Sequence, residues 1–151
     1  MKPDLQDRLY KDFPEEFREK DLPEQQTCMC WGCDCGDGWE PILRRMLEKL
    51  KGKGCTLQQV KEKFGTLRVY WSAKADIPKE DWDFISKVVG DAEDESAKTC
   101  EFCGKPGKQR PGGWIRTLCD ECDTETGREA QRKKQLDQVM KRKKDLEDAT
   151  K

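Results

Sequence analysis

The chain has 151 residues, of which 30 are lysine or arginine, 31 are aspartate or glutamate and none is histidine. Leucine, isoleucine, valine and phenylalanine make up about a sixth of the residues, below the roughly one fifth that a full-length hydrophobic core needs. We therefore expect one small ordered body with appendages, stabilised by something besides apolar burial.

The absence of histidine excludes whole classes of catalytic and metal site. Ser-His-Asp and Cys-His catalysis, the zinc deaminase site and the two-histidine metalloprotease site all require an imidazole. We expect no enzyme, although a cysteine- or carboxylate-based site is an alternative, because Asp34, Asp37 and Glu40 stand beside a loop and a helix start. Asp37 is more simply explained as a residue that caps this helix start.

The charge balance predicts a solvated surface of mixed sign. Charged residues make up 40% of the chain and the net charge is -1, unlike the uniformly basic face of a dedicated DNA-binding protein. No apolar run is long enough to span a membrane, and no basic segment precedes an apolar stretch near Met1, so we expect a cytoplasmic protein without a membrane partner. In a reducing compartment the nine cysteines are better explained as metal ligands or buried thiols than as disulfides.

Apolar residues at helical spacing predict several helices. The first set indicates a helical arm over 1–24, made of short pieces with Pro14 near the start of the second, and consists of Leu5, Leu9, Phe13 and Phe17. The second set forms the clearest helical stripe and consists of Trp39, Ile42, Leu43, Met46, Leu47 and Leu50. The third set predicts a long helix that begins near Pro78 and consists of Trp82, Ile85, Val89, Ala92 and Ser96. Residues 123–151 are expected to form a charged helical tail.

An alternating pattern around Gly65 predicts a β-hairpin. The segment 60–71 alternates on both sides of Gly65 and Thr66, which is typical of two strands joined by a tight turn. A helix from Thr56 to a cap at Gly65 is the alternative. The predicted fold class is thus α+β, with a helix, hairpin and helix body over 25–99, a zinc ribbon over 100–122 and the charged tail.

Four cysteines predict one structural zinc site. Cys100 and Cys103 are separated by fifteen residues from Cys119 and Cys122, which gives a C-x2-C-x15-C-x2-C pattern typical of zinc ribbons. The glycines and prolines between the two pairs suit a hairpin that brings the second pair across from the first. Because four protein ligands leave no open position, such a site stabilises the fold and performs no chemistry.

A second cysteine cluster has more than one interpretation. It consists of Cys28, Cys30, Cys33 and Cys35. A second metal site is one interpretation, and because C-x-C pairs are strained around a single tetrahedral ion, Cys55 would be a further ligand. A turn packed on Trp31 and Trp39 with some buried thiols is the structural alternative, and reactive thiols are a third.

Several motifs together resemble a family of small uncharacterised proteins encoded by phages and bacteria. They are Thr-Cys-Met-Cys-Trp-Gly at 27–32, Cys-Gly-Asp-Gly-Trp at 35–39, Gln-Val-Lys-Glu-Lys-Phe-Gly-Thr-Leu-Arg-Val-Tyr at 59–70, and the two cysteine pairs with their flanking residues at 99–122. The resemblance covers roughly residues 25–122, and several motifs in one order are more specific than any single one. It implies a compact helix, hairpin and zinc-knuckle unit but no established activity.

The predicted function is binding. Zinc ribbons commonly present basic hairpins to phosphates and an exposed indole can stack on a base, so the candidate nucleic-acid contacts are Lys105, Lys108, Arg110, Trp114 and Arg116. Residues 128–144 add eight basic residues against two acidic ones. Support of the ribbon from beneath by Trp114 and a solvated tail are the simpler structural explanations.

We therefore predict a non-enzymatic zinc-binding module for nucleic acid or a nucleoprotein complex, of the kind that phages use as accessory proteins. No small-molecule substrate is evident. The alternative is a phage-encoded protein-interaction factor or an inhibitor of host machinery, in which surface shape and charge do the binding.

Overall fold

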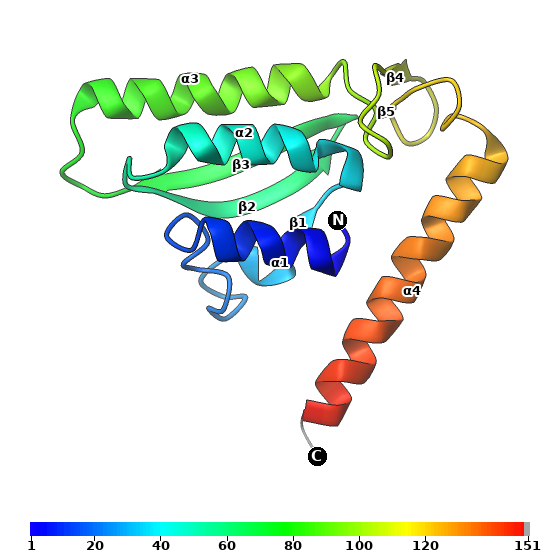
Figure 1. Ribbon diagram of the computed structural model, residues 1–151, viewed down its shortest axis with the longest axis horizontal. Helices are drawn as coiled ribbons and strands as arrows, with labels where there is room; N and C mark the ends of the chain where they lie inside the picture. The colour runs from blue at the N-terminus through cyan, green and yellow to red at the C-terminus, as the bar shows by residue number, and fades with distance from the viewer. Residues whose placement is uncertain (150–151) are drawn as a thin grey trace.

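The computed structural model describes residues 1–149 and shows an α+β protein, which confirms the predicted fold class (Figure 1). Its elements are α1 (Pro3–Asp12), η1 (Met29–Trp31), β1 (Cys33–Asp34), η2 (Asp37–Trp39), α2 (Glu40–Leu50), β2 (Cys55–Lys63), β3 (Thr66–Ala73), α3 (Lys79–Ser96), β4 (Lys108–Arg110), β5 (Arg116–Leu118) and α4 (Glu125–Ala149).

A three-stranded sheet in the order β1-β2-β3 forms the centre of the body. β2 and β3 are antiparallel and β1 adds in parallel to β2, so the hairpin prediction is confirmed and the alternative of a helix over 56–65 is wrong. The two residues between the strands, Phe64 and Gly65, have φ angles of 54° and 78°. This is the backbone of a two-residue hairpin turn, whose twist matches that of the strands.

The core lies between the sheet and α2. Every predicted position of the α2 stripe is buried: Trp39, Ile42, Leu43, Met46, Leu47 and Leu50 are at most 2% exposed. The α3 stripe is buried from Ile85 onward, but Trp82 is 48% exposed, contrary to its predicted place in the stripe. Trp82 lies in the first turn of α3, where its ring packs at a tilt against Trp71, with the ring centres 4.6 Å apart, instead of entering the core.

The N-terminal arm packs on this core but contains only one helix. α1 ends at Asp12, and 14–22 form turns rather than the predicted second helical piece. Pro14 explains the ending, because the residue before a proline is disfavoured in the helical region. Leu9, Phe13 and Phe17 are nevertheless buried in the common core.

α3 also protects the outer edge of β3. The backbone N–H of Leu67 donates to Ser96 Oγ at 2.8 Å, and that of Val69 donates to Glu93 Oε1 at 3.0 Å. Edge strands otherwise present unpaired backbone groups to other chains. Figure 1 shows α3 running along this side of the sheet.

α4 is a charged helix, as predicted, that follows the β4–β5 hairpin and projects from the body (Figure 1). The last two residues of the predicted tail, 150–151, lie outside the described residues. No helix within residues 1–149 is both long enough and apolar enough to cross a bilayer.

Replacing Leu47 by alanine is expected to lower the free energy of unfolding by about 2–5 kcal/mol, because the side chain is fully buried in this core. Urea denaturation followed by circular dichroism measures the change. Leu136, 62% exposed on α4, is the matched control, and Leu136→Ala should change stability by less than about 0.5 kcal/mol. Equal effects of the two substitutions would show that the α2 stripe is not core.

Candidate metal centre

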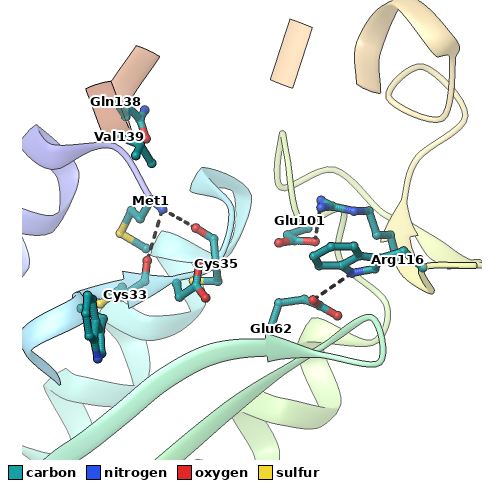
Figure 2. Close-up of a pocket in the computed structure, with 11 residues that line it drawn as sticks. Met1, Cys33, Cys35, Glu62, Glu101, Arg116, Gln138 and Val139 are labelled. Carbon is teal, nitrogen blue, oxygen red and sulfur yellow. Dashed lines mark hydrogen bonds and ion pairs between the residues drawn. The ribbon is translucent and has the colours of Figure 1, made fainter. Parts of the chain in front are cut away.

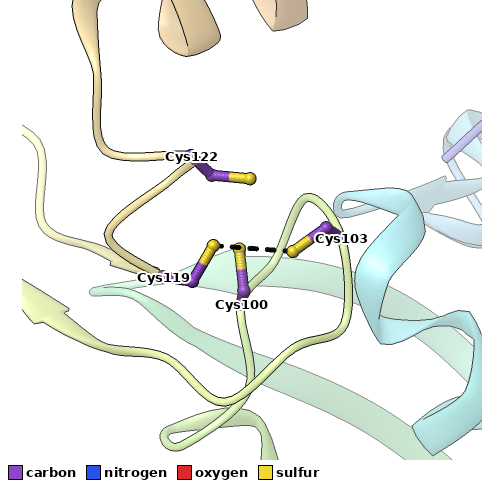
Figure 3. Close-up of side chains that lie close together, drawn as sticks. All are labelled: Cys100, Cys103, Cys119 and Cys122. Atoms are coloured by element: carbon purple, nitrogen blue, oxygen red, sulfur yellow. Dashed lines mark hydrogen bonds between the residues drawn. The ribbon is translucent and has the colours of Figure 1, made fainter.

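Two cysteine turns face each other at one end of the body (Figure 3). Cys100 and Cys103 lie in the turn between α3 and β4, and Cys119 and Cys122 follow β5. The pairing of β4 with β5 in an antiparallel hairpin brings the second turn across from the first. Each turn is closed by a backbone hydrogen bond to its first cysteine: Gly104 N–H to Cys100 O at 2.9 Å, and Asp123 N–H to Cys119 O at 3.0 Å.

The four sulfur atoms form a group that fits a tetrahedral metal ion. They all lie within 4.8 Å of one another, and Cys103 Sγ is 3.6 Å from Cys119 Sγ. Zinc–thiolate bonds of about 2.3 Å in a tetrahedron place sulfur atoms about 3.8 Å apart. The predicted set of four cysteines is therefore brought together at a spacing that could hold zinc.

The electrostatics of the cluster suit a cation. For Cys119, burial acts to raise the pKa, but the N–H of Cys122 and the neighbouring thiols outweigh it and lower the pKa to about 7. The pKa of Cys122 and that of Cys103 are raised, chiefly by burial. Four thiolates at this distance repel one another, so all four ionise together only around a positive ion.

The first cysteine turn packs against residues 36–38, which follow the second cysteine cluster and contain two glycines; we call them the glycine segment. Gly38 N–H donates to Glu101 O at 2.8 Å, and Trp39 Nε1–H donates to Thr99 O at 2.9 Å. A Cβ atom on Gly38 would collide with the carbonyl oxygen of Cys100, and one on Gly36 with that of Glu101. Glycine is therefore required at both positions by the close approach of two backbones.

Glu101 reinforces this seat. Its side chain is only 3% exposed, and Oε1 accepts the N–H of Gly36 at 3.2 Å while Oε2 lies 3.5 Å from Arg116 Nη1. Burial raises the pKa of this carboxyl to about 7, although Arg116 acts to lower it. The carboxyl group of the first cysteine turn thus meets the guanidinium of β5 beside the glycine segment.

The second cysteine cluster runs through η1 and β1. Cys28 is exposed, Cys30 is half-buried, and Cys33 and Cys35 are buried. Among the residues that the structure describes, only the four later cysteines form a group that could hold a metal, so the second metal site is not supported. Burial raises the pKa of Cys35, and it raises that of Cys55 to about 12, which keeps these thiols protonated.

The acidic residues near this turn are not gathered into a site either. Asp37 Oδ1 accepts the backbone N–H of Lys2 at 2.7 Å and its carboxylate pairs with the Lys2 ammonium. Asp37 begins η2, directly before α2, and the helix starts at η2 and α2 have no side-chain capping bond. Glu40 pairs with Arg44 at 2.8 Å.

Most of the basic side chains predicted to contact nucleic acid are paired with other groups of the protein. Arg110 donates to Leu118 O at 3.0 Å and pairs with Asp120 and Asp123. Lys105 pairs with Glu121, and Arg116 lies over the rings of Phe102 and Trp114 besides contacting Glu101. Lys108 and Trp114 are exposed.

Gly36, Gly38 and Glu101 are the residues that sequence reasoning missed. The two glycines of the Cys-Gly-Asp-Gly-Trp motif are a sequence signal for such a contact, because glycine often marks a close approach of two backbones. Nothing in the sequence indicated which segment would make that contact.

Cys103→Ser is expected to release the metal and to unfold the zinc hairpin, since structural zinc binding and folding are one equilibrium. Elemental analysis of purified, reduced protein should find about one zinc per chain in the natural sequence and none in the variant. Cys28→Ser, which removes an exposed thiol outside the cluster, is the control and should keep its zinc. An unchanged zinc content in Cys103→Ser would contradict the site.

Gly38→Ala is expected to destabilise the protein by more than about 2 kcal/mol, because the new methyl group must displace the turn around Cys100. Thermal unfolding measures the loss. Gly113 has open space around its Cα, and Gly113→Ala should be within about 0.5 kcal/mol of the natural protein. Similar stability of the two variants would disprove the glycine seat.

Comparison of the chain with protein-family models, with curated proteins and with solved structures finds no match. The resemblance to small phage and bacterial proteins therefore stays a prediction. What the geometry shows is an α+β body joined to a four-cysteine cluster that could hold zinc.

Proposed function

We propose that this protein is a non-enzymatic module, stabilised by zinc, that binds nucleic acid alone or within a nucleoprotein complex. The observation that carries the proposal is the gathering of exposed aromatic rings and uncompensated cations where the β2–β3 turn meets the β4–β5 hairpin. A closed four-cysteine site has no open coordination position for a substrate, so the cluster supports a structural role.

The two hairpins are joined by specific hydrogen bonds. Thr117 Oγ1–H donates to Gly65 O at 2.6 Å, and Trp114 Nε1–H donates to Glu62 Oε2 at 3.1 Å. These bonds hold the end of the β2–β3 hairpin against β5 and the loop that precedes it. A zinc ion in the cysteine cluster would therefore fix the position of both hairpins.

Two large aromatic side chains stand out at this junction. Phe64 is 65% exposed and Trp114 is 66% exposed. Phe64 also has the only positive φ of a non-glycine residue among residues 1–149, a conformation that costs on the order of 1–2 kcal/mol. A strained and exposed phenylalanine is explained by a surface role, and stacking of a base on such a ring is worth about 1–3 kcal/mol.

Cations accompany these rings. Lys63 Nζ lies 5.5 Å from the centre of the Phe64 ring. Lys63 and Lys108 are exposed and take part in no ion pair between described residues. The sequence of α4 adds the basic run of 128–144. Aromatic rings interleaved with free cations are typical of surfaces that bind single strands.

A protein partner is the second candidate, and one observation favours it. A cavity of about 310 Å³ opens beside the junction, and Trp31, which is 63% exposed, lines it together with Trp114. Figure 2 shows Glu62, Glu101 and Arg116 on one side of this cavity and Met1, Cys33 and Cys35 on the other. Tryptophans beside a concave surface are typical of protein-binding hot spots, as a phage inhibitor of host machinery would require.

Trp114→Ala is expected to weaken the binding of a labelled 20-nucleotide single strand by about 5- to 100-fold through the loss of stacking. Fluorescence anisotropy at 50 and 200 mM salt gives the affinity and its salt dependence. Trp82 is also an exposed tryptophan, at 48%, and lies at the end of α3 away from the cysteine cluster. Trp82→Ala is the control that should bind normally. Absence of salt-dependent binding by the natural protein would refute the proposed function and favour the protein partner.

A further inference from the structure

The outward face of the β2–β3 hairpin carries its own row of cations. In the register of the two strands Lys61 lies directly opposite Arg68, and Lys63 lies opposite Thr66. Side chains on a strand alternate between the two faces, and the neighbours of Arg68 on β3, Leu67 and Val69, are buried. Lys61, Lys63 and Arg68 therefore share the face that points away from the core.

The pairing of Lys61 with Arg68 is unfavourable by itself. Like charges directly opposite each other destabilise an antiparallel pair. Arg68 Nη1 donates to Leu67 O at 3.0 Å and to Thr66 Oγ1, both neutral acceptors. Asp34 lies beside Lys61 on β1, but neither Lys61 nor Arg68 forms an ion pair within the described part of the chain. Three cations thus face one carboxylate, and a polyanion would complement this face.

An aromatic ring continues the row. Tyr70 follows Arg68 on the same face, opposite Gln59, and is 44% exposed. At the other end of the row the chain turns at Phe64, whose ring is exposed beside Lys63. Successive residues on one face of a strand are about 6.8 Å apart. The hairpin therefore carries a continuous series, with Tyr70 at one end, the cations in the middle and Phe64 at the other end.

We infer that this face is a track for single-stranded nucleic acid, on which Arg68, Lys61 and Lys63 contact phosphates while Tyr70 and Phe64 stack on bases. The inference rests on the proposed function and names its substrate class. Stacking requires unpaired bases, and a slightly twisted strand pair offers rings and cations side by side. A duplex would present only its backbone to this face.

Two variants separate the two kinds of contact. Arg68→Gln removes one phosphate contact, so it is expected to weaken binding of a labelled 20-nucleotide oligothymidylate and to reduce the slope of log affinity against log salt by about 0.7. Tyr70→Ala removes only stacking, so it is expected to weaken binding about 5- to 100-fold with an unchanged slope. Tyr70→Phe keeps the ring and should restore most of the affinity.

Lys49→Gln is the matched control for charge. Lys49 is exposed on α2, across the core from this face, and forms no ion pair with a described residue. Its substitution changes the net charge as Arg68→Gln does, and it should leave the slope unchanged. Zinc content and circular dichroism of every variant check that the fold is intact.

Four outcomes decide between the hypotheses. Preference for the single strand over a 20-base-pair duplex, with the two effects above, would support the track. Normal binding by Arg68→Gln and Tyr70→Ala, together with weakened binding by Trp114→Ala, would overturn the track while the proposed function stands; equal binding of duplex would overturn it too. No binding of either nucleic acid by the natural protein would overturn the proposed function itself.

Discussion

The contact between the first cysteine turn and the glycine segment before α2 holds this structure together. Gly36 and Gly38 offer backbone N–H groups to Glu101, and Trp39 reaches from the buried core to the carbonyl of Thr99. Backbones can approach this closely only where no Cβ intervenes. The β4–β5 hairpin with its cysteine cluster is therefore a continuation of the body, and a zinc ion in that cluster would stabilise the core as well as its own ligands.

The arginines of the β4–β5 hairpin are engaged in contacts within the protein. Arg116 lies over the rings of Phe102 and Trp114 and beside Glu101. Arg110 donates to Leu118 O and pairs with Asp120 and Asp123. Arginines that are paired within the protein add little to the electrostatic field at its surface. Cations without an ion pair among the described residues lie instead at Lys108 and on the β2–β3 hairpin, where Lys61 and Lys63 are on β2 and Arg68 is on β3.

The elements with local signals could be predicted from the sequence. The apolar stripe of α2 and the glycine of the β2–β3 turn are short-range patterns, and the cysteine spacing defines both the ligands and the hairpin between them. The sequence pattern places Trp82 in the buried stripe of α3. Periodicity alone cannot show that the first turn of a helix extends beyond the core. The ion pairs of Arg110 and the seat of Glu101 on Gly36 could not be predicted, since their partners are selected by tertiary folding and carry no signature in the chain.

The position of α3 has a consequence for aggregation. Ser96 and Glu93 occupy the backbone N–H groups of the edge strand β3, and Ser96 lies only four residues before Cys100, so the protected edge ends where the cysteine turn begins. Loss of the metal would loosen the end of α3 that covers Leu67, and an uncovered strand edge recruits strands from other molecules. For this fold, removal of zinc would then produce intermolecular β-structure before general unfolding.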